Sequence, residues 1–164
     1  MDNHNFDIVV IGSGVIGHSI AFRLKQDDPQ LKIAVLGDPV NSLQASRAAA
    51  GMLAPFCECD KADRFFKFCR ESLDKFPEFL RELVSVSEVP VHFSIEGSLM
   101  PSSSYREAWE ERKVFFAEED IPHEVWSSDK VRQKAPYLSD NCGEVMWVRE
   151  GQVNNRQMHD ALIQ

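Results

Sequence analysis

The sequence lacks the features that mark membrane-spanning proteins and nucleic-acid-binding proteins. No stretch of about 18 apolar residues occurs, so no membrane-spanning helix is expected. Basic residues are in the minority, with 18 Lys and Arg against 26 Asp and Glu, and the formal net charge is −8. This charge argues against nucleic acid or an anionic membrane as a partner.

Metal-binding and disulfide patterns are also absent. The 164 residues include four cysteines and five histidines, and their spacings match no zinc site. We therefore expect reduced thiols and no metal. The apolar N-terminal stretch is preceded by Asp2 and Asp7, with no Lys or Arg before it, and glycines interrupt it. It does not resemble a signal peptide, so a cytoplasmic protein is expected.

The stretch from Phe6 to Pro39 has the pattern of a βαβ unit. Asp7–Ile11 is a short run of β-branched residues, as expected of a buried parallel strand. The turn Gly12–Gly17 follows it, and a helical pattern comes next. Lys32–Leu36 is a second run of strand type. The sequence therefore predicts two parallel strands joined by a helix.

The turn between the first strand and the helix has the spacing G-x-G-x-x-G. In such a turn Gly12 permits a tight bend, Gly14 lets the backbone approach a pyrophosphate, and Gly17 allows close packing of helix on strand. The N-terminus of the helix, at Val15 and Ile16, offers amide groups to the phosphates. The alternative is a tight turn with a purely structural role.

Asp38 follows the second strand and lies 21 residues beyond Gly17. An acidic side chain at about that distance binds the adenosine ribose in dinucleotide-binding folds, where the usual spacing is about 20 residues. The alternative is a turn residue before Pro39.

The rest of the chain is predicted to continue with helices and then to become rich in strands. Residues 60–84 have apolar positions at helical spacing, expected in the core, in helices broken or kinked at Pro77. These positions are Phe65, Phe68, Cys69, Leu73, Phe76, Leu80 and Leu83.

Strands are expected within Pro90–Met100 and over Glu144–Val148. A further strand is expected to end at Trp126. The segment Ser104–Glu107 is interpreted as a capping box that opens a helix, and a final helix is expected from residue 154. A boundary near residue 88 would separate a nucleotide-binding segment, residues 1–88, from a partial substrate domain, residues 89–164.

The glycine turn, together with Ser46–Leu53, resembles the FAD-dependent glycine oxidase / D-amino-acid oxidase family. The similarity continues through Phe65-Phe66 and resumes at Ala135–Tyr137 and Gly151–Val153. It implies a Rossmann-type FAD-binding βαβ unit with part of a strand-rich α+β substrate domain. It also implies FAD contacts beyond the glycine turn, at Ala45, Ser46, Arg47, Ala50, Gly51 and Met52.

The activity that the resemblance implies is oxidation of an amine or amino acid. A hydride passes from the α-carbon to the flavin, the resulting imine hydrolyses to an oxo acid, and oxygen is reduced to hydrogen peroxide. One position departs from the family pattern, because Gly37, not Asp38, aligns with the usual acidic residue. No catalytic residue is assigned.

The sheet predicted from this sequence is incomplete. Two parallel strands leave apolar faces to be covered, and the chain ends at Gln164 within an expected helix. We expect a cleaved or split enzyme whose C-terminal half is a second polypeptide. The alternatives are a fragment of an NAD-dependent oxidoreductase and a scaffold subunit of flavin-binding fold without catalysis.

Overall fold

The computed structural model describes residues 5–38 and 45–164. Asp2 and Pro39, which enter the interpretations above, lie outside these ranges. The chain forms two compact units. The first comprises residues 1–51, 78–92 and 153–164, and the second comprises residues 52–77 and 93–152.

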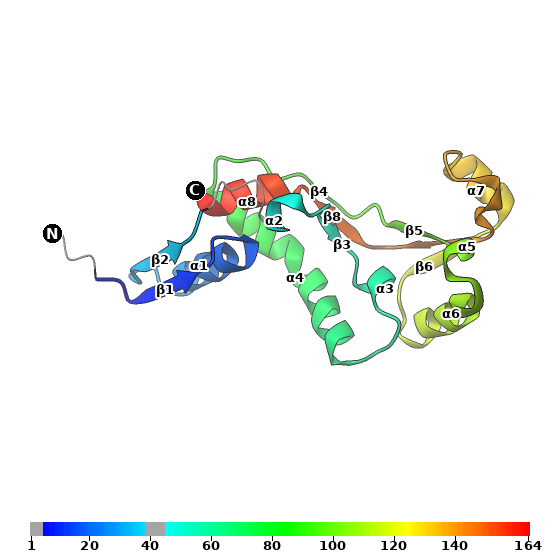
Figure 1. The fold of residues 1–164 in the computed structure, drawn as a ribbon, viewed down its shortest axis with the longest axis horizontal. Coiled ribbons are helices and arrows are strands. Elements are labelled where there is room, and N and C mark those ends of the chain that lie inside the picture. Colours follow the sequence, from blue (N-terminus) through cyan, green and yellow to red (C-terminus); the bar gives the residue numbers. More distant parts are fainter. Residues whose placement is uncertain (1–4, 39–44) are drawn as a thin grey trace. The chain divides into compact units, whose positions relative to one another are not determined.

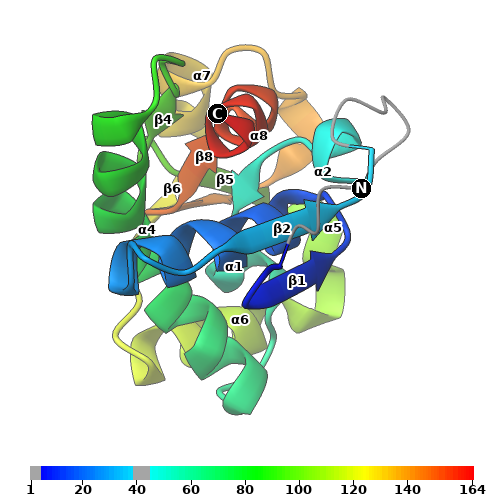
Figure 2. The same cartoon turned by 90° about the vertical axis from the view of Figure 1, so that its left-hand side faces the viewer.

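The first unit contains the predicted βαβ arrangement (Figures 1 and 2). β1 and β2 are parallel, with Ile8 opposite Ile33 and Ile11 opposite Leu36. Its elements are β1 (Ile8–Ile11), α1 (Val15–Asp27), β2 (Ile33–Leu36), α2 (Ala45–Ala48), α8 (Asn155–Ile163) and the C-terminal part of α4 (Arg64–Val86). The fold class predicted from the sequence is confirmed here.

The two-stranded sheet of the first unit exposes apolar side chains. Ile11 is 88% exposed, and Val9 and Leu36 are about half exposed. Ile16, at the start of α1, is 75% exposed. Strands of this composition are normally buried on both faces. Within the described residues, no third strand joins β1 and β2.

The second unit holds two antiparallel three-stranded sheets, ordered β3-β8-β4 and β5-β7-β6. Its strands are β3 (Met52–Leu53), β4 (Phe93–Ser94), β5 (Ser98–Pro101), β6 (His123–Trp126), β7 (Val145–Val148) and β8 (Gly151–Val153). Its helices are α3 (Pro55–Glu58), the N-terminal part of α4, α5 (Ser102–Tyr105), η1 (Arg106–Ala108), α6 (Trp109–Glu118), α7 (Ser128–Lys134) and η2 (Asp140–Cys142). The strands expected around residues 90–100, 126 and 144–148 are confirmed.

The core of the second unit lies between the central strand β7 and helices α4 and α6. Met146 and Val148 of β7 are fully buried, as is Phe116 of α6. Phe66 of α4 is also fully buried, and its ring contacts that of Phe115 at 5.3 Å between centroids. Aromatic pairs at this separation add to the free energy gained by burial.

The expected break at Pro77 is wrong, because α4 runs without interruption from Arg64 to Val86. A proline inside a helix removes one backbone hydrogen bond and crowds the preceding turn. Aromatic contacts on either side of it hold the helix in place. Phe76 packs against Phe93 in the second unit, and Phe79 packs against Phe22 in the first.

The expected burial of Phe65 and Phe68 is also wrong. They are 65% and 69% exposed, whereas Phe66 between them is fully buried. The start of the helix sets this rotation. The Asp63 carboxylate accepts hydrogen bonds from the amides of Phe65, at 2.9 Å, and Phe66, at 3.0 Å. The sequence pattern did not distinguish the two apolar faces of α4.

The capping box predicted at Ser104–Glu107 does not form. Ser104 lies within α5, Arg106 has a φ of +44°, and α6 begins only at Trp109. The first helical turn at Trp109 has no side-chain cap. Trp109, Phe115 and Phe116 of α6 are buried.

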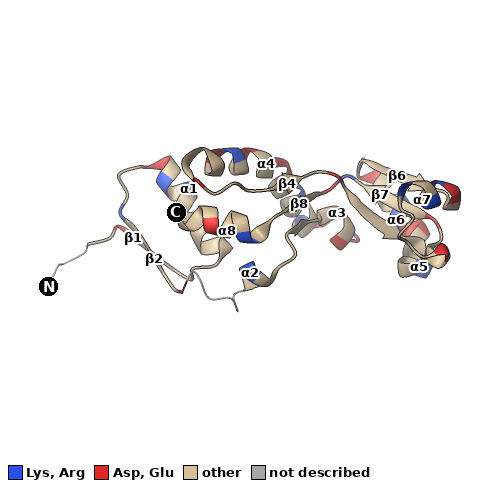
Figure 3. Ribbon diagram, turned by 90° about the horizontal axis from the view of Figure 1, so that it is seen from above, with Lys and Arg blue, Asp and Glu red and all other residues tan. Residues whose placement is uncertain are grey.

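Charged residues of both signs are interspersed along α4 and α7 (Figure 3).

Within the described residues, no helix has the length and apolarity to cross a membrane. The two units interleave along the chain and do not meet at a single boundary. The predicted division into a nucleotide-binding segment before residue 88 and a partial substrate domain after it stays a prediction.

The cap at the start of α4 predicts a specific acid sensitivity. Hydrogen bonds from the backbone, that of Phe66 above all, hold the pKa of Asp63 below its ordinary 3.8. A lowered folded-state pKa gives stability that is present above pH 3.8 and is lost as the pH falls through the folded-state value. In Asp63→Asn the amide oxygen can accept the same bonds without titrating. We expect the stability advantage of wild type over Asp63→Asn, measured by urea unfolding, to shrink only below about pH 4. An advantage that stays constant down to pH 2.5 would contradict this.

Candidate functional site: a glycine turn held by two distant segments

Close backbone contacts shape the turn from β1 into α1. The amide of Gly12 donates to the carbonyl of Leu36 at 2.8 Å, which continues the β1–β2 pairing. Gly12 has a φ of +111°, and no atom lies within 4 Å of a Cβ built there. A Cβ on Gly17 would lie 1.9 Å from the Gly12 carbonyl oxygen. Helix and strand therefore approach as closely as the fingerprint requires.

α2 contributes Ser46 to the N-terminus of α1. The amide of Val15 donates to the Ser46 hydroxyl at 2.9 Å. A Cβ on Gly14 would lie 3.0 Å from the same oxygen. The first amides of a helix have no acceptor within the helix, and Ser46 satisfies one of them. The structure thus brings together Gly14, Val15 and Ser46, three of the predicted site residues.

α8 holds α2 in position. The Asn155 side-chain amide donates to the carbonyl of Ser46 at 2.6 Å, and Arg156 Nε donates to the carbonyl of Arg47 at 3.3 Å. Arg47 itself forms an ion pair of 2.5 Å with Asp160. Two peptide carbonyls and one charged side chain of α2 therefore have partners on a single helix.

The end of β2 lies against the same turn. A Cβ on Gly37 would lie 2.4 Å from the Ser13 hydroxyl oxygen and 2.9 Å from the Ser13 amide nitrogen. Ser13 therefore leaves no room for a side chain at position 37. Asp38 is the next residue and is exposed. A role of Asp38 at the ribose stays a prediction.

The remaining predicted residues lie in α1, in α2 and in the segment that follows α2. Ala45 and Ala50 are exposed, and the Gly51 carbonyl accepts from the amide of Val153 at 2.9 Å. Met52 opens β3 in the second unit and pairs with Gln152. Ile16 is exposed at the first turn of α1. No finding tests whether any of these residues contacts a cofactor.

In the second unit, charged side chains hold both ends of the short helix α3. The Glu150 carboxylate is 1% exposed and accepts from the amides of Phe56 and Cys57 at 2.6 and 2.8 Å. The Arg112 guanidinium donates to the carbonyls of Phe56, Cys57 and Cys59. Burial, and next the Glu150 carboxylate, raise the pKa of the Cys57 thiol, so this thiol stays protonated at neutral pH.

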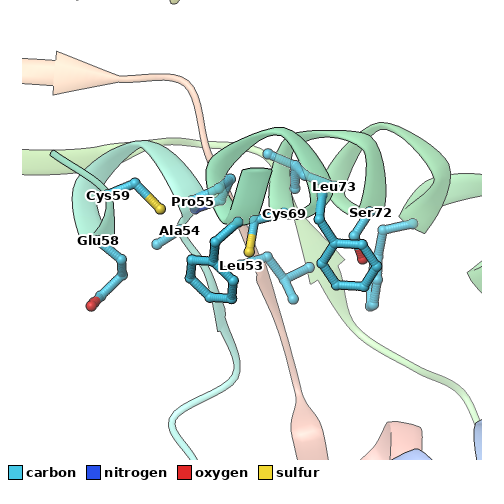
Figure 4. Close-up of a pocket in the computed structure, with 11 residues that line it drawn as sticks. Leu53, Ala54, Pro55, Glu58, Cys59, Cys69, Ser72 and Leu73 are labelled. Carbon is cyan, nitrogen blue, oxygen red and sulfur yellow. The ribbon is translucent and has the colours of Figure 1, made fainter. Parts of the chain in front are cut away.

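An apolar groove of about 430 Å³ lies between α3 and α4 (Figure 4). The exposed rings of Phe65 and Phe68 form part of its wall, with Cys69, Leu73 and Phe76 further along the same face of α4. The part of the predicted apolar stripe from Phe65 to Phe76 therefore lines this groove, whereas Leu80 and Leu83 are buried as expected. All four cysteines are free thiols, and Cys59 and Cys69 lie in the groove.

The supporting residues on α8 were missed by sequence reasoning. Asn155, His159 and Asp160 follow the glycine turn by more than 100 positions, and no motif links them to it. His159 is fully buried and contacts the carbonyl of Ser13 through Nε2 at 2.9 Å. A histidine on the apolar face of a predicted helix was the only available signal.

Comparison with known proteins identifies the family. Residues 7–164 match the family described as FAD dependent oxidoreductase. The chain belongs to that family. FAD, predicted from the sequence, is confirmed as the cofactor of the family.

The similar proteins include glycine oxidases. The chain is 34% identical over 118 residues to glycine oxidase from Bacillus licheniformis, which covers 72% of this chain. The structure of glycine oxidase from Geobacillus kaustophilus superposes with a TM-score of 0.85, at 21% identity over 98% of this chain. That from Bacillus cereus gives a TM-score of 0.80, at 26% identity over 96%. The predicted resemblance is confirmed.

The chain spans only part of these proteins. It covers 28% of the B. licheniformis protein, and 44% and 42% of the two solved chains.

The contact between Gly17 and Gly12 predicts a steric test. In Gly17→Ala the new methyl group would overlap the Gly12 carbonyl oxygen, so helix and strand must separate. We expect a loss of about 1–3 kcal/mol or more, seen as a lower melting temperature of the first unit. Ser19→Ala, one turn or less away on α1, is the control and should melt near wild type. Equal melting of Gly17→Ala and wild type would show that the turn has more room than the structure indicates.

Proposed function

We propose that this chain is the FAD-binding part of an amine or amino-acid oxidase of glycine oxidase type. The observation that carries the proposal is the glycine turn itself, at which a helix N-terminus meets open space beside Gly12. Such a position suits a pyrophosphate, because backbone amides and the helix dipole favour negative charge. The family match supports FAD in preference to NAD.

The predicted site residues would divide the contacts with this cofactor. Gly12, Gly14, Val15 and Ile16 would hold the phosphates, and Gly17 sets the distance of α1 from the strand. Asp38 would contact the ribose. Further contacts would come from the segment that starts with α2, namely Ala45, Ser46, Arg47, Ala50, Gly51 and Met52.

The bound flavin would supply the redox chemistry by accepting a hydride from the α-carbon of the substrate. Hydrolysis of the resulting imine gives an oxo acid, and oxygen is reduced to hydrogen peroxide. The similarity to glycine oxidases supports a small amine or amino acid as substrate. This chain contributes the position of the cofactor, and we assign it no proton-transfer residue. We place the enzyme in the cytoplasm.

The variant Gly14→Val tests the cofactor site. A Cβ at this position already lies 3.0 Å from the Ser46 hydroxyl, and two further methyl groups would fill the space beside the turn. We expect the purified protein to lose its bound flavin, measured as the ratio of visible flavin absorbance to protein absorbance. Ala117→Val, on an exposed position of α6 in the second unit, should retain it.

A Gly14→Val protein with full flavin content would contradict the proposal and leave the turn a structural role. A colourless wild-type protein that binds NAD would favour the NAD-dependent alternative, and one that binds neither would favour a scaffold. In Asp38→Ala we expect weaker FAD binding by about 1–3 kcal/mol, because a ribose hydroxyl that binding buries would lose its partner. An unchanged dissociation constant would move the ribose contact elsewhere.

We also propose that a second polypeptide, or further chain, covers the exposed apolar surfaces. Ile11 and Leu36 are exposed on the two-stranded sheet, and Phe65 and Phe68 are exposed along the groove. Large exposed apolar patches are typical of interaction sites. The greater length of the glycine oxidases is consistent with such a complement.

Size-exclusion chromatography tests this surface. We expect the wild-type chain to self-associate when purified alone, and the double variant Phe65→Ser/Phe68→Ser to associate less, because it removes the two most exposed rings of the groove. Val114→Ser, an exposed apolar position on α6, is the control and should behave as wild type. A sharp monomer peak for wild type with full flavin content would contradict the need for a covering partner.

A further inference from the structure

His159 lies on α8 at the centre of contacts that join the glycine turn to α2. Its side chain is fully buried, 0% exposed. Nε2 lies 2.9 Å from the carbonyl oxygen of Ser13, and Nδ1 lies 3.5 Å from the guanidinium of Arg47. The ring of His18, on α1, meets its edge at 5.4 Å between centroids. One imidazole therefore touches three elements of the first unit.

The partners of His159 determine which ring nitrogen carries the proton. A carbonyl oxygen only accepts hydrogen bonds, so Nε2 must donate to Ser13. A guanidinium only donates, so Nδ1 must be the acceptor for Arg47. These two contacts therefore require hydrogen on Nε2 and a free lone pair on Nδ1, and both nitrogens are used. Neither a phenyl ring nor an aliphatic side chain could satisfy both partners.

The bond to Ser13 fixes the backbone inside the glycine turn. Ser13 is 5% exposed and stands between the two glycines that face the proposed pyrophosphate site. A fixed Ser13 carbonyl orients the peptide that leads to Gly14, whose position controls access to the Val15 amide. His18 adds a second contact, from Nδ1 to the carbonyl of Gly14 at 3.2 Å.

The bond to Arg47 fixes the other side of the site. Arg47 also pairs with Asp160, so its guanidinium is held between two side chains of α8. Ser46, its neighbour in α2, accepts from the amide of Val15. Movement of Arg47 would therefore displace the hydroxyl that the helix N-terminus uses.

We propose that His159 is a positioning residue for the cofactor: it holds the Ser13 carbonyl and Arg47 at once, and so sets the separation of the glycine turn from α2. This inference rests on the proposed function, because it assigns the FAD pyrophosphate to the glycine turn, beside Gly12. His159 itself touches protein groups only and takes no part in the reaction.

The test compares FAD dissociation constants of three variants. His159→Leu fills a similar volume and removes both hydrogen bonds, and we expect about a tenfold weaker affinity, in line with a lost buried hydrogen bond of ordinary strength. His159→Gln can donate from its amide to Ser13 and accept from Arg47, and we expect affinity within about threefold of wild type. Met158→Ala, at the neighbouring buried position, should lower the melting temperature and leave FAD affinity unchanged.

The outcomes separate this inference from the proposed function. If wild-type protein binds no FAD, the proposed function fails. If wild type binds FAD and His159→Leu binds it as tightly, or if affinity follows melting temperature across all three variants, the positioning role fails alone. Nitrogen-15 chemical shifts of the wild-type imidazole need no variant. We expect a protonated Nε2 and an unprotonated Nδ1, and the opposite tautomer would overturn the inference.

Discussion

The first unit depends on the absence of a side chain at Gly17. The Gly12 carbonyl lies where a Cβ of residue 17 would be, so α1 rests directly on the end of β1. This contact determines where the helix N-terminus points. It also brings Ser13 against Gly37 and Gly14 against Ser46, so both neighbouring segments are placed by the same approach. Larger side chains in the turn would separate strand, helix and α2 together.

The glycine turn is only one part of the candidate site. The turn was predictable, because its glycines have a fixed spacing between a strand pattern and a helix pattern. The segment around Ser46 was identified through family resemblance, and its contact with Val15 could not be read from spacing. His159 and Asn155 were not predictable. Their contacts reach back more than 100 residues, and a buried histidine has the same sequence pattern whether or not it supports a site.

The fold of the second unit was predictable in its strands and less so in its helices. Strand positions followed from apolar runs, and the antiparallel pairing around Val145–Val148 agrees with them. The sequence pattern did not predict which face of α4 is buried, because this helix carries two apolar faces. The hydrogen bonds of Asp63 at the start of the helix orient it so that Phe66 enters the core. The helix also continues through Pro77, because packing on both sides outweighs one missing hydrogen bond. In each case tertiary contacts overrode a local pattern.

Amide hydrogen exchange of the first unit, with and without FAD, tests the central claim most directly. The account predicts that FAD slows exchange of the amides of Gly14, Val15 and Ile16, and of the segment 45–51, because the cofactor lies against both. Exchange in β6 of the second unit should not change. Unaltered exchange at residues 14–16 in a protein that has bound FAD would show that the cofactor lies elsewhere and that the glycine turn is not its site.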